Sequence, residues 1–222
     1  MSRPIDFTLK KVYFISGLGA DRRVFSFLDL SFCEPVFIDW ITPLKNESLA
    51  SYALRLRKEI PGEAPVIIGI SFGGMLLTEM AKEETAIKAI IISSSKSKRE
   101  LPLFLKIGKY LPLYKLSPSQ LLKKIAVLFK GMFSAKGKEQ KKVLSEIIAD
   151  TDPHFLKWAI GAILNWNNEV TPKNLIHIHG SADKLLPYKH IKADHTIEDG
   201  AHLMVMDKHD EISSLLRQLI AG

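Results

Sequence analysis

Six short runs rich in apolar and β-branched residues recur along the chain, separated by polar or glycine-containing segments. Several of them are apolar at nearly every position, which is typical of parallel strands covered on both faces. The pattern therefore predicts six strands in a mostly parallel sheet. They span residues 11–16, 35–40, 65–70, 87–93, 175–180 and 194–199.

Segments with helical periodicity lie between and after these runs, at residues 47–59, 72–83 and 208–220. Strands that alternate with helices along a chain are joined by right-handed crossovers, and the helices cover both faces of the sheet. The chain is therefore predicted to have a doubly wound α/β fold.

The alternation stops near residue 96 and resumes near residue 173. The interval contains four helical patterns and no strand pattern, with prolines near the helix starts or in the connections. We expect residues 96–172 to form a small all-helical cap inserted between two strands of a core made of residues 1–95 and 173–222. A cap of this kind covers an active site. The four predicted helices span residues 100–110, 118–130, 137–149 and 153–166.

The net charge of +7 is concentrated in this interval, because residues 96–142 contain 13 basic and 2 acidic residues. A solvated basic surface is the simplest explanation. Contact with an anionic substrate such as an acyl-CoA, or with acidic lipid headgroups through the amphipathic segment 118–133, is the alternative. Nucleic-acid binding is not expected, because no recognised nucleic-acid-binding module accompanies the charge.

Targeting signals and metal-binding spacings are not evident in the sequence. The first residues lack a signal-peptide pattern, and no apolar run reaches the roughly 18–20 residues that a membrane span needs. The protein is therefore expected to be soluble and cytoplasmic. The single cysteine, Cys33, cannot form an internal disulfide, and we expect it to be a small buried side chain rather than a reactive thiol.

The stretch GISFG at residues 69–73 matches the pattern Gly-x-Ser-x-Gly, directly after a predicted strand and before a predicted helix. This context indicates a nucleophile elbow, a sharp and strained turn that raises the hydroxyl of Ser71 above the strand ends. Gly69 and Gly73 are explained because a Cβ at either position would clash with neighbouring backbone. Gly74 is expected to let the helix pack closely on the sheet. An ordinary glycine-rich turn is the alternative interpretation.

A serine hydroxyl becomes an effective nucleophile only when a base removes its proton and a third group orients that base. After this kind of elbow the acid is expected first and the histidine second. Asp183 lies in a polar loop just past a predicted strand, and His202 follows the last predicted strand. Gly200 and Ala201 leave room for the imidazole. We therefore predict a catalytic triad of Ser71, Asp183 and His202.

Other candidates fit this chemistry less well. His177 and His179 alternate on one strand face, but a strand flanked by core offers few further metal ligands. No metal site is predicted, and we expect His179 to be hydrogen-bonded within the structure. Asp39 also ends a predicted strand, but it precedes the serine, and the SSSKSK stretch at residues 93–98 carries no carboxylate.

An acyl-transfer site also needs backbone N–H groups that bind the developing oxyanion. Phe72 directly follows the candidate nucleophile and would supply one of them. The stretch SGLG at residues 16–19 follows the first predicted strand, and its small residues permit the required turn. The N–H of Leu18 is the expected second donor, with a plain glycine-rich turn as the alternative.

With these residues the chain resembles the α/β-hydrolase superfamily over nearly its whole length, apart from the predicted cap. The resemblance rests on SGLG for the oxyanion loop, GISFGG for the elbow, HGSAD for the acid and GAH for the base. Family members usually have a histidine where Ser16 stands, so the resemblance covers the N–H groups of this loop and not its bracing side chains. It implies a trimmed, six-stranded α/β-hydrolase fold that starts at the family's third strand.

The resemblance also narrows the chemistry. Relatives that open epoxides or remove halide use an aspartate at the elbow, whereas this chain has Ser71. A serine triad suits hydrolysis of a carboxylic ester or thioester through an acyl-enzyme, without a cofactor. Two alternatives stay open: a small-molecule receptor with little turnover, and a lyase or carbon–carbon bond hydrolase.

The substrate is expected to be a small molecule with an apolar acyl group, and the pattern assigns no substrate-binding residue and no oligomeric state. Arg22 and Arg23 could bind a substrate carboxylate or simply lie at the surface. Aromatic residues of the predicted cap could line an acyl pocket or form the cap's own core. They are Phe104, Tyr110, Tyr114, Phe129, Phe133, Trp158 and Trp166.

Overall fold

The computed structural model describes residues 9–108, 110, 117–118 and 137–221 of the 222-residue chain. None of the helices in these ranges is long and apolar enough to span a lipid bilayer.

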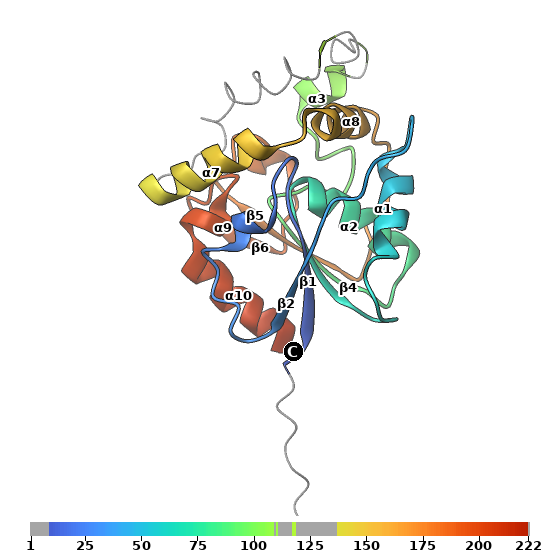
Figure 1. Ribbon diagram of the computed structural model, residues 1–222. Helices are drawn as coiled ribbons and strands as arrows, with labels where there is room; N and C mark the ends of the chain where they lie inside the picture. The colour runs from blue at the N-terminus through green and yellow to red at the C-terminus, as the bar shows by residue number, and fades with distance from the viewer. Residues whose placement is uncertain (1–8, 109, 111–116, 119–136, 222) are drawn as a thin grey trace, which may run out of the picture.

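All six predicted strands are present, and every neighbouring pair is parallel. They form one sheet in the order β2-β1-β3-β4-β5-β6 (Figure 1). Because the strands are parallel, their carboxyl ends meet at one edge of the sheet, which is where α/β proteins place their ligands. The strands are β1 (Lys11–Ile15), β2 (Glu34–Ile38), β3 (Val66–Ile70), β4 (Lys88–Ile92), β5 (Leu175–Gly180) and β6 (His195–Ile197).

Helices pack on both faces of this sheet, as the doubly wound prediction requires. Side chains alternate across β1, so Tyr13 and Ile15 are buried against α1 (Leu49–Arg57) and α2 (Phe72–Glu83). Val12 and Phe14 point to the opposite face, where they are buried in a second apolar cluster with residues of three further helices. The sheet is therefore covered on both sides by apolar layers. The helices of this second face are η1 (Arg22–Phe25), α9 (Met204–Asp207) and α10 (His209–Ala221).

Helices α1, α2 and α10 match the three helical segments predicted outside the cap. The short elements η1, α9 and η2 (Tyr188–His190) were not predicted, because three or four residues are too few to show a period. Cys33 is buried as expected, and burial raises the pKa of its thiol to about 11.

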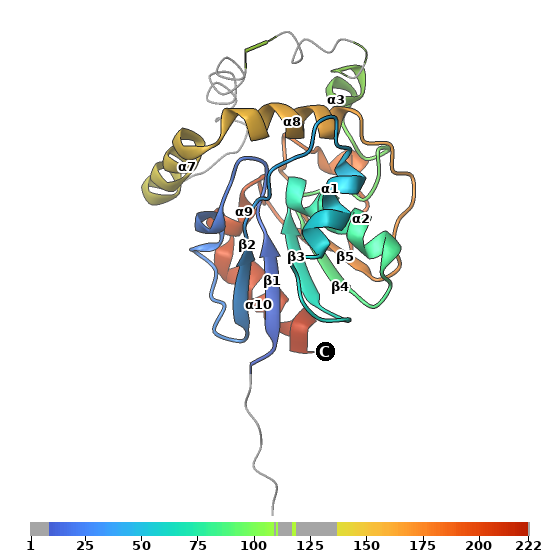
Figure 2. The same ribbon diagram turned by 45° about the vertical axis from the view of Figure 1, so that its right-hand side comes forward.

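Between β4 and β5 the described residues form helices and no strand. They are α3 (Leu103–Gly108), α7 (Lys138–Asp150) and α8 (Pro153–Leu164), which match three of the four predicted helices of this interval. The predicted helix 118–130 falls outside the described residues, except for its first position. Figures 1 and 2 show α7 and α8 lying across the end of the sheet to which the strands point.

These helices share the apolar clusters of the sheet. Phe155 and Ala159 of α8 belong to the cluster that contains α1 and α2, whereas Leu144 and Ile147 of α7 belong to the cluster on the other face. Both helices are therefore anchored against residues that the sheet also buries. The division into a core and a cap of residues 96–172 stays a prediction.

Two glycines bring β3, α2 and the loop after β1 into contact. A Cβ on Gly69 would lie 2.6 Å from the carbonyl oxygen of Gly73, and one on Gly73 would lie 2.5 Å from the carbonyl oxygen of Ile15. Both distances are far below van der Waals contact, so neither position accepts a side chain. A Cβ on Gly74 would lie 2.5 Å from Cβ of Ser94, which confirms the close packing expected there.

We expect Gly73→Ala to lower the free energy of unfolding by about 3 kcal/mol or more, because backbone atoms of β1 and the next loop would have to move. Gly17→Ala is the matched control, since a Cβ there would make an ordinary 3.5 Å contact with Cβ of Ser71. Its cost is expected to stay within about 1 kcal/mol. Urea denaturation followed by circular dichroism measures both values. Equal stability of the two variants would show that the close backbone contacts of Gly73 do not restrict this position.

Candidate active site

Ser71 lies at the turn between β3 and α2 and has backbone angles of φ 50° and ψ −114°. A positive φ costs a residue with a Cβ about 1–3 kcal/mol unless the surroundings enforce it. Here the amide of Ser71 donates to the carbonyl of Ile92 (2.9 Å), and the hydroxyl of Ser94 donates to the carbonyl of Ser71 (2.7 Å). The strained turn predicted at this serine is therefore present, and hydrogen bonds on both sides hold it.

The loops that carry the other two predicted residues are joined through backbone. The amide of Ala182, which lies just after β5, donates to the carbonyl of Gly200, which lies just after β6 (3.0 Å). That carbonyl lies so close to Gly180 that a Cβ on Gly180 would overlap it. Gly200 therefore packs against Gly180 in addition to the predicted role of leaving room for the imidazole, and no sequence signal indicates the role of Gly180. Their contact fixes the spacing between Asp183 and His202.

Ser71, His202 and Asp183 form a continuous hydrogen-bonded line. The Nε2 atom of His202 lies 3.0 Å from Oγ of Ser71, and its Nδ1 atom lies 2.8 Å from Oδ2 of Asp183. The other carboxylate oxygen, Oδ1, accepts hydrogen bonds from the amides of Leu185 (2.8 Å) and Leu186 (2.9 Å). Asp183 and His202 are both buried. The structure thus brings together three residues that are 131 positions apart at most.

The environment of Asp183 keeps its carboxyl ionised. Burial alone would raise its pKa, but the adjacent imidazole of His202, the amide of Leu186 and the imidazole of His179 together lower it below the usual value. An ionised carboxylate only accepts hydrogen bonds, so the proton shared with His202 belongs to Nδ1. The lone pair of Nε2 then faces the hydroxyl of Ser71, which is the arrangement a general base requires.

His177 and His179 form a second buried pair beside the carboxylate. The Nε2 atom of His179 lies 2.8 Å from the carbonyl of Leu186 and 3.4 Å from Oδ2 of Asp183. Its Nδ1 atom lies 3.3 Å from Nε2 of His177. The expectation that His179 is hydrogen-bonded within the structure is confirmed. In the described part of the chain, no three His, Cys, Asp or Glu side chains are grouped to hold a metal ion.

The two predicted oxyanion donors lie in the wall of a cavity that also contains Ser71 and His202. Phe72 is the first residue of α2, so its amide has no acceptor inside that helix. Leu18 lies in a loop whose turn is closed by a hydrogen bond from the amide of Ala20 to the carbonyl of Gly17 (2.9 Å). The hydroxyl of Ser16 donates to the carbonyl of Ala20 (2.8 Å) and so braces the loop from within.

The cavity has a volume of about 550 Å³, and its described lining is apolar except at the reactive end. Ser71, His202 and Thr151 provide the polar side chains of this lining, and no Asp, Glu, Lys or Arg takes part in it. Helices α7 and α8 supply Leu144, Ile147 and other aliphatic side chains to the walls. The cavity therefore offers space for an uncharged apolar group next to the hydroxyl of Ser71.

The candidate aromatic residues of the predicted cap have different roles. Phe104 lines the cavity. Trp158 packs on Tyr52 with ring centroids 4.4 Å apart, and the indole N–H of Trp166 donates to buried Glu79 (2.6 Å). Tyr110 is exposed, and the other three candidates, Tyr114, Phe129 and Phe133, lie outside the described residues.

Two arginines after the loop at residues 16–19 are the candidates for binding a substrate carboxylate. Arg22 and Arg23 are absent from the described cavity lining. Arg23 forms ion pairs with Asp21 (2.6 Å) and Asp150 (2.8 Å). The position of Arg23 therefore favours the alternative of a surface arginine over that of a clamp for a substrate carboxylate.

The buried histidine pair predicts a pH dependence of stability. Burial lowers the pKa of both His177 and His179 below the usual value near 6.5, so the unfolded chain binds more protons than the folded chain once the pH falls below about 6.5. The free energy of unfolding is expected to fall between pH 7 and pH 5, by up to about 1.4 kcal/mol per pH unit for each histidine.

Urea denaturation at several pH values measures this slope, and His177→Leu should reduce it. Exposed His154→Leu is the matched control and should leave it unchanged. Glu100 contributes to the slope with the opposite sign, because burial raises its pKa. This contribution is the same in the wild type and in both variants. A slope that His177→Leu leaves unaltered would contradict the assignment.

No protein-family model and no curated protein matches this sequence. Solved structures with similar folds include a hydrolase from Pseudomonas aeruginosa, with a TM-score of 0.75, 12% identity and coverage of 97% of this chain and 91% of that chain. A carboxylesterase structure from Nitrososphaera gargenis has a TM-score of 0.73 and 15% identity, covering 100% of this chain and 97% of that one. An esterase from Thermogutta terrifontis has a TM-score of 0.72 and 15% identity, covering 96% and 90%. Together with the parallel sheet and the turn at Ser71, these similarities show that the chain has the α/β-hydrolase fold.

Proposed function

We propose that the protein is a serine hydrolase that cleaves a carboxylic ester or thioester of a small molecule. The proposal rests on the hydrogen-bonded line from Asp183 through His202 to Ser71, with distances of 2.8 and 3.0 Å, which ends at an apolar cavity. Similarity to solved esterases is in line with this chemistry, although the fold alone does not determine it.

In the proposed reaction, His202 accepts the proton of Ser71 while Oγ attacks the carbonyl carbon of the substrate. The N–H groups of Leu18 and Phe72 stabilise the negative charge that develops on the carbonyl oxygen. His202 then gives the proton to the departing alcohol or thiol, which leaves an acyl group on Ser71. Water, deprotonated by His202, attacks the acyl carbon, and His202 returns the proton to Oγ of Ser71 as the carboxylic acid leaves. Asp183 remains ionised throughout and orients the imidazole.

The cavity favours an uncharged apolar acyl group. An ionised group placed there would lose its hydration without gaining an opposite charge from the described lining, and such a transfer costs several kcal/mol. The negatively charged part of a CoA thioester would therefore have to lie outside this cavity. A volume of about 550 Å³ is ample for a medium-length aliphatic or aromatic acyl chain.

We expect His202→Ala and Asp183→Asn to lower kcat by a factor on the order of 10³–10⁴, without unfolding the protein, and Ser71→Ala to abolish turnover and labelling by a fluorophosphonate. Hydrolysis of short p-nitrophenyl esters and gel-based labelling measure these effects. His154→Ala, at an exposed position, is the matched control and should retain wild-type kcat.

Two results would argue against this function. Wild-type kcat in His202→Ala or Asp183→Asn would show that the residues are not catalytic. Rapid labelling of Ser71 with negligible turnover of all esters and thioesters tested would instead favour the receptor or the lyase alternative.

The absence of charged side chains from the described lining predicts substrate selectivity. The p-nitrophenyl ester of hexanoic acid should be hydrolysed with a kcat/KM at least about 100-fold above that of the p-nitrophenyl monoester of adipic acid, which has a carboxylate at the end of a chain of equal length. Steady-state kinetics at pH 8 and at two salt concentrations measure the ratio. Comparable kcat/KM values for the two esters would mean that the acyl group does not enter this cavity.

A further inference from the structure

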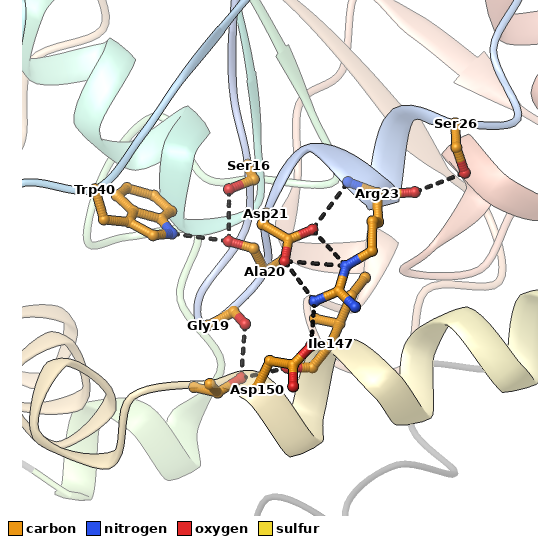
Figure 3. A network of polar contacts seen from close by, with 10 residues as sticks. Ser16, Gly19, Ala20, Asp21, Arg23, Ser26, Trp40, Ile147 and Asp150 are labelled. Carbon is orange, nitrogen blue, oxygen red and sulfur yellow. Dashed lines mark hydrogen bonds and ion pairs between the residues drawn. The ribbon is translucent and has the colours of Figure 1, made fainter.

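The loop that carries the proposed oxyanion donor Leu18 is held by four hydrogen bonds to three of its carbonyl groups. Figure 3 shows the bonds that reach the carbonyls of Ala20 and Gly19. The carbonyl of Gly17 accepts from the amide of Ala20 (2.9 Å). The carbonyl of Ala20 accepts from the hydroxyl of Ser16 and the indole N–H of Trp40, both at 2.8 Å. The fourth bond, to the carbonyl of Gly19, links the loop to the segment that follows α7.

Thr151, the C-cap residue directly after α7, donates this fourth bond. Its hydroxyl oxygen lies 2.7 Å from the carbonyl oxygen of Gly19 and 2.8 Å from that of Ile147, so one hydroxyl proton is shared between two acceptors. The side chain also fills the space beside Gly19, because a Cβ there would lie 2.7 Å from Cγ2 of Thr151. Gly19 has a φ of +67°, a conformation that suits glycine.

These contacts form an ordered series that reaches the oxyanion donor. The carbonyl of Gly19 and the N–H of Ala20 belong to one peptide group, and the carbonyl of Gly17 and the N–H of Leu18 belong to another. No cis peptide occurs in the described chain, so each N–H points opposite its carbonyl. When Thr151 binds the carbonyl of Gly19, it turns the N–H of Ala20 toward Gly17, and the carbonyl of Gly17 in turn sets the direction of the Leu18 N–H.

Hydrogen bonds in such a series also polarise one another, so a donor at one end strengthens the N–H at the other. The ion pair between Arg23 and Asp150 joins the same two segments. Its side chains are 33% and 66% exposed, and exposed pairs contribute little. The half-buried hydrogen bond from Thr151 therefore carries most of the effect.

Thr151 caps a helix that also forms part of the wall of the cavity. Leu144, Ile147 and Ile148 of α7 line it together with Leu18 and Ser71. A displacement of α7 would therefore change both the space for an acyl group and the hydrogen bond to Gly19.

We propose that Thr151 is a positioning residue that directs the Leu18 N–H toward the oxyanion, and that α7 thereby couples occupancy of the acyl cavity to the competence of the oxyanion site. This proposal rests on the proposed hydrolase function for its catalytic part. The hydrogen-bond series from Thr151 to the loop at residues 16–21 is independent of that function.

The test compares Thr151→Val, which keeps the shape and loses the donor, with Thr151→Ser, which keeps the donor. Thr151→Val is expected to lower kcat on a p-nitrophenyl ester on the order of tenfold, with KM changed less than about twofold. The inhibition constant of a trifluoromethyl ketone, which forms an oxyanion on the enzyme, should rise by the same factor. Thr151→Ser should keep kcat and the inhibition constant close to their wild-type values. Hydrogen exchange in residues 17–21 should be faster in the valine variant only.

Two control variants lie on α7. Ser145→Ala removes a hydroxyl that donates to the carbonyl of Lys141, one turn earlier in the helix. Asp150→Asn removes the exposed ion pair with Arg23. Both should leave kcat within about twofold of wild type. If Thr151→Val does not fold, as judged by its melting temperature, Thr151→Ala and Thr151→Ser are compared in the same way.

Wild-type kcat and wild-type hydrogen exchange in the valine or alanine variant would overturn the proposal. So would a change confined to KM, because Thr151 would then act only as part of the cavity wall. If the wild-type protein hydrolyses no ester, the hydrolase function fails. The exchange of residues 17–21 then decides alone whether Thr151 holds the loop.

Discussion

The turn at Ser71 is the constraint on which the rest of the site depends. A side chain is held at positive φ between a buried strand and a buried helix, and that geometry is possible only because Gly69 and Gly73 let three backbone segments approach closely. The energetic cost of the turn is offset by hydrogen bonds to its flanking peptide groups from β4 and Ser94. The result is a hydroxyl fixed at the carboxyl edge of the sheet by the fold itself.

The polar groups behind this hydroxyl are satisfied almost entirely by one another and by backbone. Asp183 is buried, yet two amides and two histidines surround it, so its carboxyl stays ionised inside a largely apolar interior. His179 contributes to this arrangement without facing the cavity, since its ring lies between Leu186 and His177. A buried network of this kind is stable only when its members are paired, which makes it rigid as well as polar.

The helices between β4 and β5 complete the site from the other side. They supply eight of the apolar residues in the described wall of the cavity, and the C-cap of α7, Thr151, reaches the loop after β1. The same segment holds the excess of basic residues, yet none of its described lysines or arginines lines the cavity. Lys98 and Arg99 pair instead with Glu169, which fits a solvated surface better than a substrate clamp.

The sequence by itself determined the six strands, the flanking helices and the three residues of the hydrogen-bonded line. Its signals for them are local: apolar runs, a glycine-flanked serine after a strand, and polar residues at strand ends. Only the tertiary structure decided how those loops touch. The contact of Gly180 with Gly200, the bracing of Ala20 by Ser16 and Trp40, and the hydrogen bond from Thr151 to Gly19 join segments up to 132 residues apart. Such pairings follow from packing in three dimensions, and no periodic pattern in one chain segment records them.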